Sequence, residues 1–135
     1  MYVGRLAIDS MRDLPPSVRK AVLCNVVEAL VSANREYLRQ NPRTPPLYGS
    51  GARYVFVGSL WQDIPAILQS LTGECEGFTA WRIAELRERA REEGARPEVF
   101  EFSEMKPIGL VHEYHVLVRR ADGRIEDPSR RLGMP

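Results

Sequence analysis

The longest regular pattern of apolar positions predicts an amphipathic helix from about residue 15 to about residue 40. Apolar side chains recur there at the spacing of an α-helix, about 3.6 residues per turn. The recurring positions are Val18, Val22, Val26, Leu30, Ala33 and Tyr37. Pro15 and Pro16 suit the first turn of this helix, and Asn41-Pro42 ends it.

Two more helices are predicted in the middle of the chain. Asp63 is a good N-cap, with Pro65 in the first turn of a short helix. A longer helix begins near Cys75, runs from about residue 74 to about residue 93, and has a suitable left-handed end at Gly94. Cys75 heads the stripe that we expect to be buried. The other members of this stripe are Thr79, Ile83, Leu86 and Ala90.

Strand patterns dominate the last third of the chain. Residues 97–103 alternate as a strand, residues 108–119 are rich in β-formers, and residues 124–127 return after an Asp122-Gly123 turn. Residues 53–57 suit a brief strand, whereas residues 2–8 suit either an edge strand or an N-terminal arm. This order predicts an α+β fold, with N-terminal helices and the Cys75 helix packed on a small antiparallel β-sheet.

The composition of the chain indicates the number of domains and the kinds of partner to expect. With 135 residues and 44% hydrophobic content, the chain is long enough for one domain with a single core. The 19 basic and 18 acidic residues nearly cancel, and no basic stripe is interleaved with aromatics, so no nucleic-acid partner is expected. Apolar runs stay below the roughly 20 residues of a membrane span, and no signal-peptide pattern opens the chain. We therefore expect neither a membrane partner nor secretion by that route.

Cys75 is the first candidate for chemistry. A thiol at a helix N-terminus faces unpaired backbone N–H groups, so we expect its pKa to lie below the free value of about 8.5. The alternative is a small core residue, which is the commoner role of an unpaired cysteine on an apolar helix face. Cys24 lies in an apolar stripe and is expected to be a buried thiol. A Cys24–Cys75 disulfide stays open as an alternative, although a reducing compartment fits better.

A nucleophilic cysteine needs a histidine and a group that orients the imidazole. His112 and His115 lie three apart on one predicted strand and therefore face opposite sides. A three-residue loop that pairs Arg120 with Arg124 makes His115 and Asp127 diagonal neighbours, whereas a two-residue loop would separate them. His112 is expected to be structural. No metal site is expected, because two imidazoles on opposite faces do not converge.

These residues carry a resemblance to a known family. Gly73-Glu74-Cys75-Glu76, His115 on a strand and Asp127-Pro128-Ser129 after a hairpin resemble the transglutaminase-like, papain-fold cysteine hydrolases, especially their small bacterial and phage-encoded members. Trp61 and Pro65 before the cysteine are also similar, and the resemblance covers about residues 47–134. The sequence departs from the family pattern at Glu74, where Asp is usual, and at Gly77, where an acidic residue is common.

The resemblance implies a papain-like core in a single transglutaminase-like domain over residues 1–135. Residues 1–46 would form an N-terminal arm and helix, and residues 47–135 the catalytic core. It implies that Cys75 attacks an amide carbonyl to form a thioester, with His115 carrying the proton and Asp127 orienting the imidazole. The backbone N–H of Cys75 would bind the oxyanion, with Trp61 or Gln62 as the second donor. The alternative for Trp61 is a core or interface aromatic.

The function expected from this resemblance is a cysteine protease, amidase or acyltransferase that acts on peptide or glutamine-type amide bonds. It would take a protein or peptide substrate and need no cofactor. We expect water rather than a protein amine to take the acyl group, because a chain of 135 residues has little left beyond its two long helices to build a second wall that guides an amine. The alternative is a non-enzymatic phage virion or host-interaction module on the same scaffold. The resemblance implies a cytoplasmic protein of a bacterium or of a phage-infected host, or a virion-associated one.

Overall fold

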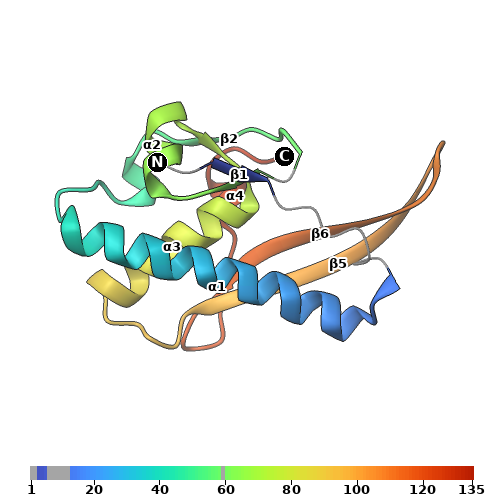
Figure 1. The fold of residues 1–135 in the computed structure, drawn as a ribbon, viewed down its shortest axis with the longest axis horizontal. Helices are drawn as coiled ribbons and strands as arrows, with labels where there is room; N and C mark the ends of the chain where they lie inside the picture. The colour runs from blue at the N-terminus through green and yellow to red at the C-terminus, as the bar shows by residue number, and fades with distance from the viewer. Residues whose placement is uncertain (1–2, 6–12, 59) are drawn as a thin grey trace.

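The protein is an α+β molecule with a small antiparallel sheet, as the sequence predicts. The computed structural model describes residues 3–5, 13–58 and 60–135. Its sheet has the order β5 (Arg96–Lys106), β6 (Gly109–Arg119) and β7 (Ile125–Glu126). Two helices pack together on this sheet, α1 (Pro16–Gln40) against β5 and α3 (Cys75–Arg89) against β6 (Figure 1).

The predicted long helix and the predicted short helix are both confirmed. α1 begins at Pro16 and ends at Gln40, where the chain turns toward Pro42. In α2 (Ile64–Ser70), the Asp63 side chain accepts a hydrogen bond from the backbone N–H of Ala66 at 3.0 Å, as expected of an N-cap.

The Cys75 helix is shorter and more deeply buried than the sequence predicts. α3 ends at Arg89, and Arg91, with φ of 54°, takes the left-handed conformation that we expected of Gly94. A single buried stripe is also too narrow a description, since Trp81 and Glu85 are buried as well. α3 contacts α1 and β6 and also α2, α4 (Pro128–Arg131) and β3 (Leu60–Gln62), so segments from most of the chain pack against this helix.

The two long strands form a hairpin in continuous antiparallel register, in which Phe100 lies opposite His115. The far end of this hairpin projects away from the helices (Figure 1). The predicted three-residue turn that follows β6 is confirmed: the N–H of Arg120 donates to the carbonyl of Arg124 at 2.8 Å, and Gly123 has φ of 91°. β6 and β7 consequently pair in the predicted register, with Val118 opposite Glu126.

Short ladders hold the segments around α3. β1 (Val3–Arg5) pairs antiparallel with β3 (Leu60–Gln62), and the remainder of the predicted segment 2–8 lies outside the described residues. β2 (Arg53–Tyr54) is shorter than the predicted strand 53–57, and it pairs parallel with β4 (Thr72–Gly73). The remaining elements are the short helices η2 (Leu47–Gly49) and α4 (Pro128–Arg131).

One hydrophobic core joins the two parts of the chain that the sequence separates at residue 47. Leu23, Val27 and Val31 of α1 belong to the same buried cluster as Trp81 and Val116. Both cysteines are free thiols, so the disulfide alternative is wrong, and Cys24 is half-buried. Among the described residues, none of the helices has the length and apolar character needed to cross a membrane.

Candidate active site

The first turn of α3 lies at the edge of β6, where β7 stops pairing. β7 pairs with Val118 and Arg119 only. One step further along β6, the Thr79 hydroxyl donates to the carbonyl of Val116 at 3.1 Å, and the backbone N–H of Val116 hydrogen-bonds the Cys75 thiol. The start of α3 thus occupies the edge position that β7 has left. Cys75 therefore contacts the residue that directly follows His115 on β6.

His115 and Asp127 form the predicted pair. Nε2 of His115 lies 3.0 Å from Oδ2 of Asp127. The other carboxylate oxygen, Oδ1, caps α4 by accepting from the N–H of Arg130 at 3.2 Å. Because an ionised carboxylate only accepts hydrogen bonds, Nε2 carries the hydrogen in this pair. Nδ1 is then the nitrogen that can take a proton.

Cys75, His115 and Asp127 line one cavity of about 810 Å³. Phe56, Phe100 and Phe102 line the same cavity, with exposed fractions of 71%, 47% and 49%. Cys75 is buried, with 8% of its surface exposed. The three residues of the sequence-predicted triad therefore line a single cavity, which three phenylalanines also line.

Cys75 lies at the edge of β6, where it meets the backbone N–H of Val116. The neighbouring residues Tyr114 and His115 both line the cavity, and the Tyr114 hydroxyl donates to Oε1 of Glu76 at 2.8 Å. Residues from both faces of a strand can reach a group that lies beyond its edge. The side chain of His112 is outside the described part of the chain.

The predicted second oxyanion donors lie elsewhere in the described structure. Trp61 and Gln62 belong to β3, are buried, and are not among the described residues that line the cavity. Trp61 is part of the hydrophobic core cluster, which agrees with the alternative of a core aromatic. Their role at an oxyanion stays a prediction that this placement does not support.

The electrostatic surroundings of Cys75 contradict the expectation of a low thiol pKa. Burial raises the pKa of the Cys75 thiol, and the neighbouring carboxyl of Glu76 raises it further, against a lowering by the backbone N–H of Val116. Burial likewise raises the pKa of Glu76. Desolvation and a nearby acid therefore outweigh the helix N-terminus here.

Two residues beside the thiol were given no role by the sequence analysis. Glu76 was noted only as part of the cysteine motif, although its position directly after Cys75 was a usable signal. Tyr54 also lines the cavity, and burial followed by the nearby Cys75 thiol raises its pKa. Tyr54 reaches the site because its backbone N–H donates to the carbonyl of Leu132 at 2.9 Å, a pairing that no local pattern encodes.

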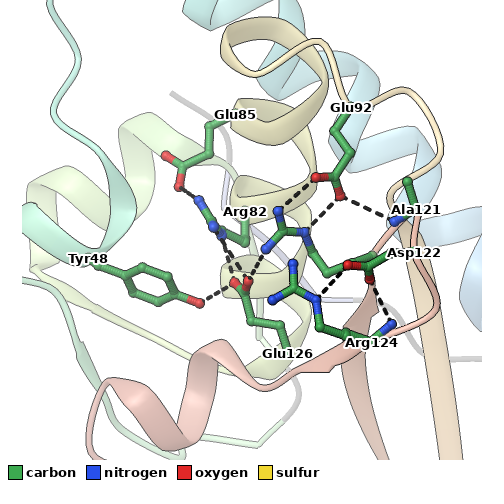
Figure 2. A network of polar contacts seen from close by, with 9 residues as sticks. Tyr48, Arg82, Glu85, Glu92, Ala121, Asp122, Arg124 and Glu126 are labelled. Atoms are coloured by element: carbon green, nitrogen blue, oxygen red, sulfur yellow. Dashed lines mark hydrogen bonds and ion pairs between the residues drawn. The ribbon is translucent and has the colours of Figure 1, made fainter.

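A network of arginine and glutamate side chains fixes β7 against α3 (Figure 2). Glu126 of β7 accepts hydrogen bonds from Arg82 of α3 at 2.6 Å and from Arg120 at 2.9 Å. The Tyr48 hydroxyl donates to the same carboxylate, and Arg120 also binds Glu92 at 2.7 Å. Glu126 directly precedes Asp127. The network therefore joins the helix that carries Cys75 to the strand that delivers Asp127.

Among the described residues, no three His, Cys, Asp or Glu side chains are grouped so that they could hold a metal ion.

Comparisons of the chain with protein-family models, curated proteins and solved structures found no match.

Proposed function

We propose that the protein is a cysteine-dependent hydrolase that acts on peptide or glutamine-type amide bonds through Cys75, His115 and Asp127. The observation that carries this proposal is the His115–Asp127 hydrogen bond of 3.0 Å at the cavity where Cys75 begins α3. A nucleophile, a base and a group that orients the base are the three parts that acyl transfer requires.

In the first step, the Cys75 sulfur forms a bond to the amide carbon and the carbonyl π electrons move to oxygen. The thiol proton passes to Nδ1 of His115. The Nε2–H group of His115 stays hydrogen-bonded to the Asp127 carboxylate. When the tetrahedral intermediate collapses, the C–N bond breaks and the leaving nitrogen takes the proton from His115. The product is a thioester on Cys75 and a free amine, or ammonia for a glutamine side chain.

In the second step, water attacks the thioester and gives its proton to His115. The C–S bond then breaks, a carboxylic acid leaves, and sulfur recovers the proton. The raised pKa of Cys75 makes the resting sulfur a neutral thiol. Proton transfer to His115 then accompanies the attack, as general-base catalysis.

The finer fold assignment belongs to the same proposal. A papain-like, transglutaminase-like core would have a cysteine at the start of a central helix, followed in sequence by a strand with the histidine and then the acidic residue. The order of α3, β6 and Asp127 supports this assignment. We further propose a protein or peptide substrate, no cofactor, and a cytoplasmic or virion-associated setting in a bacterium or phage-infected host.

A second candidate is a non-enzymatic virion or host-interaction module on this scaffold. The burial of Cys75 and its raised pKa favour this candidate, because a binding module has no need for a reactive thiolate.

Hydrolysis of a peptide and glutamine-amide library, with Cys75→Ala and Cys24→Ala compared, tests between the two. A hydrolase loses all turnover in Cys75→Ala and keeps it in Cys24→Ala, since Cys24 lies against the carbonyl of Pro97 and is not among the described residues that line the cavity. New amino termini or ammonia formed equally by both variants would rule out the cysteine mechanism.

A further inference from the structure

Two phenylalanines of β5 lie on the same face of the sheet as His115. Phe100 is paired with His115 across the hairpin, and Phe102 is paired with Glu113. Directly opposite residues of an antiparallel pair point to one face, with Cβ atoms about 4.5–5.5 Å apart, and alternate residues of a strand share that face. Phe100 is therefore the cross-strand neighbour of the imidazole, and Phe102 lies two residues further along β5.

The two phenylalanine rings are accessible from the cavity. Their exposed fractions are 47% and 49%, and both line the cavity of about 810 Å³ together with Cys75 and His115. The opposite face of β5 carries Glu101, whose carboxylate binds Arg19 of α1 at 3.0 Å. α1 thus packs on that opposite face and does not cover the rings.

Ion pairs border the two rings on the same face of the sheet. Glu98 binds Arg119 at 3.0 Å on one side of them, and Lys106 binds Glu113 at 2.7 Å on the other. These flanking charges have partners of opposite sign, and the surface between them is apolar. A charged group placed against the rings would lose water without gaining a partner there, which is unfavourable. The rings therefore favour an apolar group.

The order of the groups across the sheet indicates which part of a substrate reaches the rings. β5 pairs with one edge of β6, whereas the start of α3, with Cys75, contacts Val116 at the other edge. His115 lies between Cys75 and Phe100. In the proposed mechanism the imidazole passes its proton to the leaving nitrogen, so this nitrogen lies over His115. The chain that continues from the leaving nitrogen then runs away from the sulfur, toward β5.

We propose that Phe100 and Phe102 bind a large apolar side chain of a peptide substrate, on the residue that directly follows the cleaved bond. This inference rests on the proposed function and narrows it to peptide-bond hydrolysis, because the ammonia that leaves a glutamine amide has no side chain for the rings to contact. The cavity volume of about 810 Å³ lies within the range of about 300–1,000 Å³ that is typical of ligand sites.

Cleavage of a peptide library by the whole chain tests the inference, with the cleaved bonds located by mass spectrometry. The best substrate is then synthesised with either phenylalanine or alanine directly after the cleaved bond, and a glutamine-containing peptide reports the release of ammonia. We expect kcat/KM to be about tenfold to 100-fold higher for the phenylalanine peptide than for the alanine peptide. Cleavage of the phenylalanine peptide should also exceed the release of ammonia.

The double variant Phe100→Ala/Phe102→Ala should lower this phenylalanine-to-alanine ratio by about tenfold or more, because it removes the surface that the side chain contacts. A displaced His115 would slow both peptides equally and leave the ratio unchanged. Met105→Ala is the matched control, since it removes another exposed apolar side chain of β5 that is absent from the described cavity lining. It should keep the wild-type ratio.

An unchanged ratio in the double variant would overturn the inference, as would wild-type cleavage that ignores the residue after the bond. Release of ammonia without peptide cleavage would overturn it too. All three results leave the proposed function standing, because turnover that depends on Cys75 persists. If the wild type and Cys75→Ala are equally inactive on every peptide and amide, the proposed function and this inference fail together.

A second copy of the chain is the other occupant that the two rings could take. Sedimentation equilibrium of the wild type and of the double variant distinguishes this case. A wild-type dimer that the double variant abolishes would assign the rings to an interface between copies and overturn the inference. The same oligomeric state in both proteins, together with the change in the peptide ratio, would support it.

Discussion

The Asp127 carboxylate has two tasks at once, because one oxygen binds the imidazole of His115 and the other caps α4. The helix cap prevents the carboxylate from turning away when the imidazole becomes charged. The orientation of His115 therefore depends on a local backbone contact as well as on its own packing.

Replacing His115 with alanine should abolish measurable turnover, since a positioned general base contributes about 100-fold to 10,000-fold. His112→Ala is the matched control, because it removes the other imidazole of the same strand, three residues from His115. Turnover of the hydrolysed library substrate by each purified variant makes the measurement. Loss of turnover in His112→Ala with none in His115→Ala would invert the assignment.

Asp127→Asn separates the two tasks of this residue. Asparagine caps a helix as well as aspartate does, so we expect the melting temperature to change little. Turnover should fall by roughly 1,000-fold or more, because an amide permits the wrong imidazole tautomer. Thermal unfolding and library turnover of the same sample measure both effects. Unchanged turnover would remove Asp127 from the mechanism.

At the residue scale, the sequence predicts the contact between His115 and Asp127, but it does not predict the raised pKa of the Cys75 thiol. His115 and Asp127 are paired by strand alternation and turn length, which are local rules. The pKa of Cys75 instead depends on burial by distant segments and on the Glu76 carboxyl, and these outweigh the local effect of the helix terminus.

At the scale of elements, α3 and β7 are held together by charge. Glu126 of β7 forms ion pairs with Arg82 of α3 and with Arg120 (Figure 2). Its side chain is only 15% exposed. These guanidinium groups and the Tyr48 hydroxyl hold the pKa of Glu126 below its ordinary value of 4.5, although burial opposes them.

A depressed pKa in the folded state means that ionised Glu126 stabilises the fold above the unfolded pKa and that this contribution is lost as pH falls through the lower, folded value. We expect Glu126→Gln to cost about 3 kcal/mol near pH 7, because two largely buried guanidinium groups lose their partner. The cost should shrink as pH falls below 4.5, the ordinary glutamate value.

Urea unfolding of Glu126→Gln between pH 3 and pH 7 measures this effect. Glu36→Gln on α1 is the control, since Glu36 pairs with Arg39 in an exposed contact and should contribute less than about 1 kcal/mol at every pH. A loss in Glu126→Gln as small as the loss in the control would show that the network adds no net stability.

α1 and α2 were predictable because each has a clear start signal and an apolar pattern of helical spacing. The two long strands were predictable from their β-forming residues, although β5 runs to Lys106, beyond the predicted end at residue 103. The end of α3 was not, because Gly94 is the expected left-handed residue whereas the chain uses Arg91. Gly94 lies where a Cβ would come within 2.9 Å of Ala121, so a tertiary contact decides the use of this glycine. The docking of α3 at the edge of β6 has no local signature either.

At the scale of the whole molecule, the cavity lining combines aromatic and acidic side chains. It includes three phenylalanines, Phe56, Phe100 and Phe102, and three glutamates, Glu74, Glu76 and Glu113. A transferase needs a second surface that excludes water while it guides an amine to the thioester. With α1 and α3 both used for the core, the described chain has little left to build that surface.

We therefore expect water to be the acceptor. Incubation with casein and a fluorescent primary amine should release ammonia or new amino termini in excess of the amine that becomes attached. Cys75→Ala supplies the background for all three products. Cys75-dependent attachment of the amine above the hydrolytic products would make the protein a transferase.

Both tryptophans lie in the hydrophobic core cluster, Trp61 in β3 and Trp81 in α3, with exposed fractions of 8% and 0%. Indole emission moves to longer wavelength when water reaches the ring, so the native protein should emit at short wavelength and shift once on unfolding. Trp61 lies before α2 in the chain and Trp81 lies after it, so the two rings report on two different segments. The emission maximum of each variant can be measured on the same sample as its turnover. It distinguishes a folded variant with an impaired active site from an unfolded one.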